Sequence, residues 1–244
     1  MKRWAGWWLA LVFASLLVVG CVGKVAPKGN SADALHYTLQ LGYGYLDNGQ
    51  YDVALEKFQR ALELDQGSSE AYLGMAETYA RIGQRAKAEA HYRRAIALAK
   101  NPGAAHNNYG AFLCAQGKAR AAESEFLAAL ADPTYKTPAF AYTNAAICIR
   151  KLPDLAKAKA YLDQAIEIDP RFAQAWRERA SLAFEEGQYV AARGYLERYH
   201  QLTAPGRDSL SLAYRIELAA GNTAAAERLA VRLKKEYGDD ASSP

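Results

Sequence analysis

Residues 35–68 read LHYTLQLGYGYLDNGQYDVALEKFQRALELDQGS, and these 34 residues set the period of the chain. The glycine that closes the first half of this stretch recurs at the same interval, as Gly49, Gly83 and Gly117 and then as Gly187 and Gly221. A small residue recurs in the second half, as Ala54, Ala88, Ala122, Ala158, Ala192 and Ala226. Six such units fit between Leu35 and Asp240, so the chain is predicted to be a repeat protein.

The repeated pattern predicts two antiparallel helices in each unit. Small residues at a helix crossing let the two axes approach to about 8–10 Å. Glycine is the residue that most readily takes the left-handed turn that ends a helix. One pair of helices cannot bury its apolar face alone, so the units must stack. Thr137 and Pro138 add two residues to one period, and they predict a slight irregularity in the stack, not a domain boundary.

The same positions resemble the tetratricopeptide repeat, whose pattern places Leu-Gly, Tyr, Gly, Ala, Phe and Ala at fixed places in 34 residues. The first unit carries all of them, as Leu41, Gly42, Tyr45, Gly49, Ala54, Phe58 and Ala61. The resemblance implies an all-α fold, a right-handed superhelix of about six helix–turn–helix repeats within a domain of residues 34–240. The expected repeats are 35–68, 69–102, 103–136, 139–172, 173–206 and 207–240, with a short tail at 241–244.

The composition limits the classes of function. The chain has 244 residues, of which 51% are hydrophobic and 23% charged, and its 30 Lys plus Arg face 26 Asp plus Glu. The basic surplus is small and spread out, so we expect no nucleic-acid partner. The four histidines occupy four different places of the repeat, and no metal-ligand spacing, nucleotide loop or nucleophile motif occurs. We therefore expect no enzyme activity, metal, cofactor or small-molecule substrate.

The amino-terminal residues predict export. A basic head, Met1-Lys2-Arg3, precedes an uncharged stretch from Trp4 to Gly23, which is the layout of a secretory signal. Residues 18–21, Val-Val-Gly-Cys, resemble the bacterial lipobox, which implies a signal peptide at 1–20, lipidation of Cys21 and a tether at 21–33. Val22 follows, with no Asp at that place, and by resemblance to Gram-negative lipoproteins this permits sorting to the outer membrane. An uncleaved transmembrane anchor is the alternative, because about 20 uncharged residues can just span a bilayer.

Candidate binding residues lie on the first helices, which line the concave face in tetratricopeptide proteins. By that resemblance, places 2, 5, 6, 9, 12 and 13 of each repeat face the groove. Asn108 and Asn144 both occupy place 6, and successive amides on one face can bind an extended peptide backbone. The other candidates for the partner-binding groove are Tyr43, Leu46, Asn107, Ala111, Phe140, Ile147 and Arg177, with Arg150 and Lys151 adding positive charge beside them. In the alternative interpretation, the asparagines are simply solvated and the aromatic residues belong to the core.

Two cysteines lie on adjacent first helices, Cys114 at place 12 of its repeat and Cys148 at place 10. A disulfide between them would tie repeat three to repeat four and stabilise the fold by about 2–4 kcal/mol. We expect that disulfide because the compartment beyond the inner membrane is oxidising. Two buried thiols are the alternative.

A closer resemblance is to the PilW (PilF) family of type IV pilus biogenesis and stability proteins. It rests on the lipobox, on the six repeats and on residues 107–118, NNYGAFLCAQGK. The resemblance implies a pilotin, a lipoprotein on the periplasmic face of the outer membrane that binds secretin subunits and promotes their localisation and multimerisation there. The alternatives are a scaffold lipoprotein for outer-membrane protein insertion or peptidoglycan enzymes, and a chaperone-like holder of pilin subunits.

Overall fold

The computed structural model describes residues 31–152 and 155–238, and within these ranges it contains twelve α-helices and no strands. The helices form six consecutive pairs: α1 (Ser31–Asp47) and α2 (Tyr51–Leu64), α3 (Ser69–Arg81) and α4 (Arg85–Leu98), α5 (Gly103–Ala115) and α6 (Ala119–Ala131), α7 (Pro138–Ile149) and α8 (Leu155–Ile168), α9 (Ala173–Glu185) and α10 (Tyr189–Leu202), and α11 (Arg207–Ala219) and α12 (Thr223–Tyr237). The predicted all-α fold is confirmed. The predicted signal peptide, Cys21 and the tail at 241–244 lie outside the described residues, whereas α1 begins inside the predicted tether.

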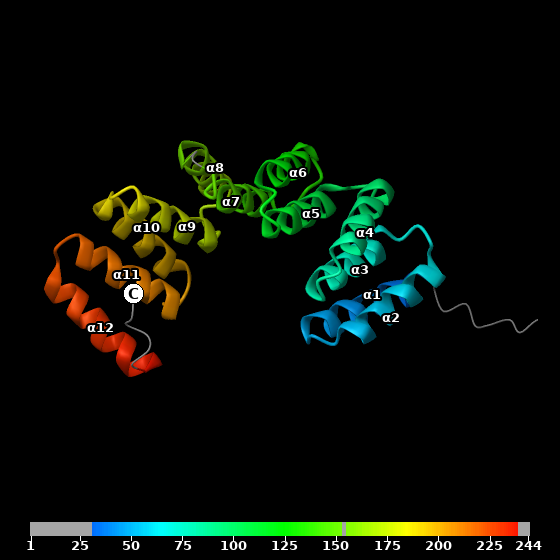
Figure 1. The fold of residues 1–244 in the computed structure, drawn as a ribbon, viewed down its shortest axis with the longest axis horizontal. Helices are drawn as coiled ribbons and strands as arrows, with labels where there is room; N and C mark the ends of the chain where they lie inside the picture. Colours follow the sequence, from blue (N-terminus) through cyan, green and yellow to red (C-terminus); the bar gives the residue numbers. More distant parts are fainter. Residues whose placement is uncertain (1–30, 153–154, 239–244) are drawn as a thin grey trace, which may run out of the picture.

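The pairs follow one another around an open arch (Figure 1). The amino-terminal pairs α1–α4 form one arm, α5–α8 cross the middle, and α9–α12 form the other arm. The first helices α5, α9 and α11 lie on the inner side of the arch relative to their partners α6, α10 and α12. Among the described residues, each pair packs only against the pair before it and the pair after it, as in a stacked superhelix.

The turns inside the pairs are left-handed at the recurring glycines. Gly49, Gly83, Gly117, Gly187 and Gly221 have φ between 71° and 77°. At Gly83 the turn also satisfies the carbonyls at the end of α3, because the N–H of Gly83 donates to Ala80 O at 3.1 Å and that of Gln84 to Tyr79 O at 2.9 Å. A side chain at this φ would be strained, which explains why the turn residue recurs with the period.

The core is built from small residues at the helix crossings and large rings beside them. Ala54, Ala88, Ala122, Ala158 and Ala192 have no exposed surface, and neither have the rings of Phe58 and Phe126. Phe58 of α2 fills space left by two glycines on other helices. A Cβ at Gly42 of α1 would lie 2.6 Å from this ring, and one at Gly74 of α3 would lie 2.3 Å from it. One ring therefore fixes the relative positions of three helices.

The two extra residues in the sequence lengthen one junction between pairs. Residues 132–137 link α6 to α7, whereas each of the other junctions is two residues shorter, at 65–68, 99–102, 169–172 and 203–206. The longer junction is held in place by Asp132, whose carboxylate accepts from the N–H of Gly103 at 2.9 Å and from the N–H of Thr134 at 2.9 Å. Tyr135 packs on Gly103, where a Cβ would lie 2.7 Å from the tyrosine side chain. The predicted irregularity is thus a tethered loop.

Cys114 of α5 and Cys148 of α7 form a disulfide in the structure, with their Cα atoms 5.6 Å apart. The bond joins two neighbouring first helices and closes a loop with a sequence separation of 34 residues. It therefore crosses the boundary between repeats three and four, in the middle of the arch (Figure 1).

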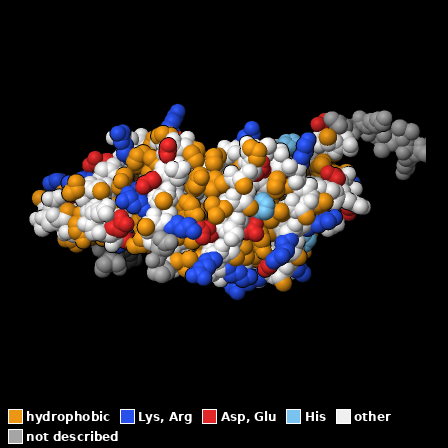
Figure 2. All heavy atoms as spheres, turned by 90° about the horizontal axis from the view of Figure 1, so that it is seen from above, with side chains coloured by type: hydrophobic (Ala, Val, Ile, Leu, Met, Phe, Trp, Pro, Cys, Tyr) orange, Lys and Arg blue, Asp and Glu red, His pale blue; other side chains and the backbone are white. Residues whose placement is uncertain are grey.

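Charged side chains of both signs are scattered over the surface. On the face that Figure 2 shows, Lys and Arg alternate with Asp, Glu and hydrophobic side chains along the length of the molecule. In the part of the chain that the structure describes, no helix has both the length and the apolar character needed to cross a bilayer.

The glycines around Phe58 provide a direct test of the packing. Gly74→Ala is expected to lower the free energy of unfolding by about 1–3 kcal/mol, because the new methyl group must displace a fully buried ring. Gly44→Ala is the matched control in α1, since a Cβ there meets no atom within 4 Å. It should stabilise the helix by up to about 1 kcal/mol. Urea unfolding followed by circular dichroism measures both, and equal effects would contradict the close packing at Gly74.

Candidate functional site

A hollow of about 630 Å³ opens between repeats two, three and four. Five of the residues predicted for the partner-binding groove line it: Asn107, Asn108, Ala111, Phe140 and Asn144. Other walls come from α3 and α4, through Glu77, Arg81, Arg85 and Tyr92. The hollow therefore spans three first helices, and we call it the central groove.

A ladder of side-chain hydrogen bonds runs along the central groove. The amide of Asn144 on α7 donates to Asn107 Oδ1 at 3.1 Å, and Asn107 donates to Asn108 Oδ1 at 3.2 Å. Asn108 in turn donates to Glu77 Oε1 on α3 at 2.6 Å. Three amides thus point in one direction and end on one carboxylate.

The three asparagines differ in exposure. Asn107 is only 3% exposed, so it is a buried link that orients its neighbours. Asn108 and Asn144 are half-buried and face the groove. Each amide has two N–H donors and uses one in the ladder. The remaining N–H groups are available to carbonyl oxygens of a partner, which suits a peptide backbone.

Burial governs the ionisation of the groups around Glu77. It raises the pKa of the Glu77 carboxyl above its ordinary value, and the hydrogen bond from Asn108 and the charge of Arg81 oppose that shift. The hydroxyl of Tyr92 has a raised pKa for the same reason, with the charge of Glu77 as the second cause. The inner wall of the groove is therefore poorly solvated, which strengthens hydrogen bonds made there.

The predicted residues of repeat one lie outside the central groove. Tyr43 packs edge-on against Phe58, with ring centroids 5.0 Å apart, and its hydroxyl donates to Glu70 O at 3.2 Å. Leu46, also predicted for the groove, is 7% exposed and belongs to the same core cluster as Phe58, so it does not line the central groove. Ile147 of α7 is half-buried but is not part of the groove wall.

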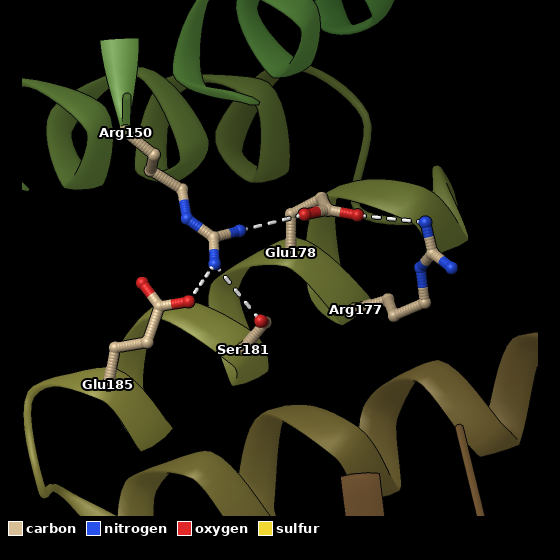
Figure 3. A network of polar contacts seen from close by, with 5 residues as sticks. All are labelled: Arg150, Arg177, Glu178, Ser181 and Glu185. Carbon is tan, nitrogen blue, oxygen red and sulfur yellow. Dashed lines mark hydrogen bonds and ion pairs between the residues drawn. The ribbon is translucent and has the colours of Figure 1, made fainter. Parts of the chain in front are cut away.

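Arg150, predicted to add positive charge beside the groove, lies at the end of α7 and forms ion pairs with α9 (Figure 3). Its guanidinium donates to Glu178 at 2.9 Å, to Ser181 Oγ at 3.1 Å and to Glu185. All three partners lie on α9, so this network ties repeat four to repeat five. Lys151, next in the chain, reaches back and donates to Cys114 O at 3.4 Å.

Arg177 is also separated from the central groove. It pairs with Glu178 at 2.8 Å, beside the Arg150 network (Figure 3). It lines a different hollow of about 340 Å³ between α9 and α11, together with Ser181, Asp208 and Arg215. Of the nine predicted groove residues, five line the central groove, whereas Tyr43, Leu46, Ile147 and Arg177 lie elsewhere.

Glu77 and Arg81, which occupy places 9 and 13 of repeat two, were not among the predicted groove residues. Both places belong to the set expected to face the groove, so the signal was present. The predicted groove residues came from repeats one, three, four and five, and none was taken from repeat two. The described residues contain no group of three or more His, Cys, Asp or Glu that could hold a metal ion.

Comparisons with known proteins agree with the repeat pattern. Family models described as tetratricopeptide repeat match residues 45–102 and 150–206. The type IV pilus assembly protein PilF of Pseudomonas aeruginosa is 29% identical over 237 residues, which cover 93% of each chain. The crystal structure of PilW, a widely conserved type IV pilus biogenesis factor, is similar with a TM-score of 0.77 at 30% identity, covering 86% of this chain and 96% of that chain. The structure of Pseudomonas aeruginosa PilF has a TM-score of 0.75 at 27% identity, covering 87% and 96%.

Because the pKa of Glu77 is raised, the free energy of unfolding should depend on whether this carboxyl is charged. The folded state holds this proton more tightly than the unfolded state does. The protonated carboxyl therefore stabilises the fold fully below the ordinary Glu pKa of about 4.3. This stabilisation is lost as the pH rises through the raised pKa of Glu77. Glu77→Gln keeps an oxygen for Asn108 and removes the charge. We expect the variant to be more stable than the wild type at neutral pH, and this difference should disappear in acid.

Thermal unfolding of both proteins across this pH range measures the difference. The control is Glu63→Gln, which changes an exposed carboxylate of α2. A Glu77→Gln variant that is less stable than the wild type at neutral pH would contradict this description of the groove wall.

Proposed function

This chain belongs to the family of tetratricopeptide-repeat proteins of type IV pilus biogenesis, and from that premise we propose that it acts as a pilotin. The central groove binds a segment of a secretin subunit. A lipid on Cys21 anchors the protein to the periplasmic face of the outer membrane. The protein thereby brings secretin subunits to that membrane and promotes their multimerisation into the pore through which the pilus passes.

The ladder of Asn144, Asn107 and Asn108 is the observation that carries this proposal. It joins three repeats, and its asparagines in repeats three and four place N–H donors at the surface of a hollow, which suits the backbone of an extended chain. Each neutral hydrogen bond contributes only about 1 kcal/mol net, so apolar contacts must supply the rest. Phe140 and Ala111 offer such contacts in the same hollow.

Two features support the proposed location. The sequence has a basic head, an apolar run and a lipobox-like end before Cys21, as expected of an exported lipoprotein. The disulfide between Cys114 and Cys148 suits the periplasm, because structural disulfides persist in oxidising compartments. A single acyl chain gives only marginal attachment and two or more hold firmly, so a fully lipidated Cys21 would keep the arch at the membrane.

Removal of the lipid site tests the anchoring step. Cys21→Ala is expected to leave secretin subunits unassembled or in the wrong membrane, because the bound subunit loses its route to the outer membrane. Membrane fractionation and detection of heat-resistant secretin multimers measure this. Val22→Ala, which leaves the lipidated residue in place, is the control. Normal outer-membrane multimers in the Cys21→Ala strain would rule out the pilotin role and leave another envelope scaffold as the interpretation.

Replacing the two half-buried asparagines of the ladder tests whether the central groove binds the partner. Asn108→Ala combined with Asn144→Ala should weaken binding of the secretin subunit by about 1–2 kcal/mol, because two donors to the peptide backbone are lost. Isothermal titration calorimetry measures the affinity, and thermal unfolding confirms that the variant is folded. Asn48→Ala combined with Asn101→Ala changes two exposed asparagines outside the groove as the control. Unchanged affinity in the groove variant would place the binding site elsewhere.

A further inference from the structure

A second hollow, of about 540 Å³, lies next to the central groove. Its lining is mostly apolar and includes Pro138, Ala139, Phe140, Ile168 and Phe172. Phe140 lines both hollows, so the two are neighbours that share a wall. We call the second hollow the apolar pocket.

The apolar pocket is a product of the lengthened junction between repeats three and four. Lys136, Thr137 and Pro138, at the end of that junction and the start of α7, form one side of the pocket. The junction is tethered through Asp132 and Tyr135, as described above, so its backbone does not need to be ordered by a ligand. A preformed pocket costs little conformational entropy when it is filled.

Large apolar side chains are exposed together in this pocket. Phe140 is 38% exposed and Ile168 is 46% exposed, and Phe140 meets the ring of Phe172 edge-on with centroids 6.0 Å apart. Their exposure is unfavourable in water unless a partner covers them, and a clustered apolar patch rimmed by polar residues is typical of an interaction site.

The other end of the central groove is positively charged. Arg81 of α3 and Arg85 of α4 line it, and neither forms an ion pair with a residue that the structure describes, although the charge of Arg81 acts on Glu77. Glu77 is the only carboxylate in the groove lining, and Asn108 already occupies one of its oxygens. The two guanidinium groups outnumber the single carboxylate, so this end of the groove has an excess of positive charge. It is therefore complementary to an acidic side chain.

We propose that the segment bound by this protein is an extended peptide that places a large aliphatic or aromatic side chain in the apolar pocket and an acidic side chain against Arg81 and Arg85. The inference rests on the proposed function and specifies what the secretin segment must carry. From α3 to α7 there are two helix-to-helix steps of about 8–10 Å each. An extended chain advances about 3.3 Å per residue, so the acidic and apolar side chains should be about six residues apart.

The experiment uses the mature lipidated protein in lipid nanodiscs and two probes: the secretin subunit of the same bacterium, and a random library of displayed linear peptides. The library should be enriched in peptides with Asp or Glu about six residues from Phe, Leu, Ile or Trp. Ile168→Ser should abolish the apolar preference and weaken binding of both the selected peptide and the secretin subunit about tenfold, since one buried large aliphatic contact is lost. Arg81→Gln combined with Arg85→Gln should abolish the acidic preference.

Leu127→Ser is the matched control, because Leu127 on α6 is 44% exposed and lies outside both hollows. The inference is overturned if the secretin subunit binds the wild type and Ile168→Ser equally well, or if the selected peptides show no apolar position. A concentration-dependent dimer that Ile168→Ser abolishes would also overturn it, because a second copy would then cover the pocket. If the secretin subunit does not bind the wild type, the proposed function is contradicted instead. The peptides selected from the library then test the apolar and acidic preferences independently of the secretin.

Discussion

Close approach of helices at positions that lack a side chain is the constraint on which the structure depends. Phe58 occupies the space that Gly42 and Gly74 leave, and Phe126 does the same against Gly110, where a Cβ would lie 2.7 Å from its ring. Because interiors are packed as densely as crystals, these rings leave the helices little freedom to slide. The first helices of repeats three and four are joined by the disulfide between Cys114 and Cys148, and on these two helices Asn107 meets the side chain of Asn144.

The polar ladder is what this fixed spacing makes possible. Amides and carboxylates that leave water must find partners, and a half-satisfied network is worse than an apolar surface. Here the partners come from the first helices of three successive repeats, and the network ends on Glu77, an acceptor with a raised pKa. The side chains that line the groove are consequently held in place by one another, and Asn108 and Asn144 each use one of their two N–H donors in the ladder.

The period of 34 residues predicted the all-α stack because packing, turn and crossing residues each repeat with it. The same period placed Asn108 and Asn144 on one face. It could not predict the fate of Arg150, since the network with Glu178 and Glu185 depends on how α9 is rotated against α7. Nor could the period predict that Leu46 packs with Phe58 in the core, because burial depends on the neighbouring side chains of repeat one.

The lengthened junction at 132–137 shows that the stack accepts extra residues between pairs. Contacts in the stack are made only between adjacent pairs, so an insertion between pairs leaves the interior of every repeat unchanged. The additional residues remodel one local surface and leave the recurring sequence pattern intact. Junctions are therefore positions where related arches can diverge in what they recognise while they retain a common scaffold.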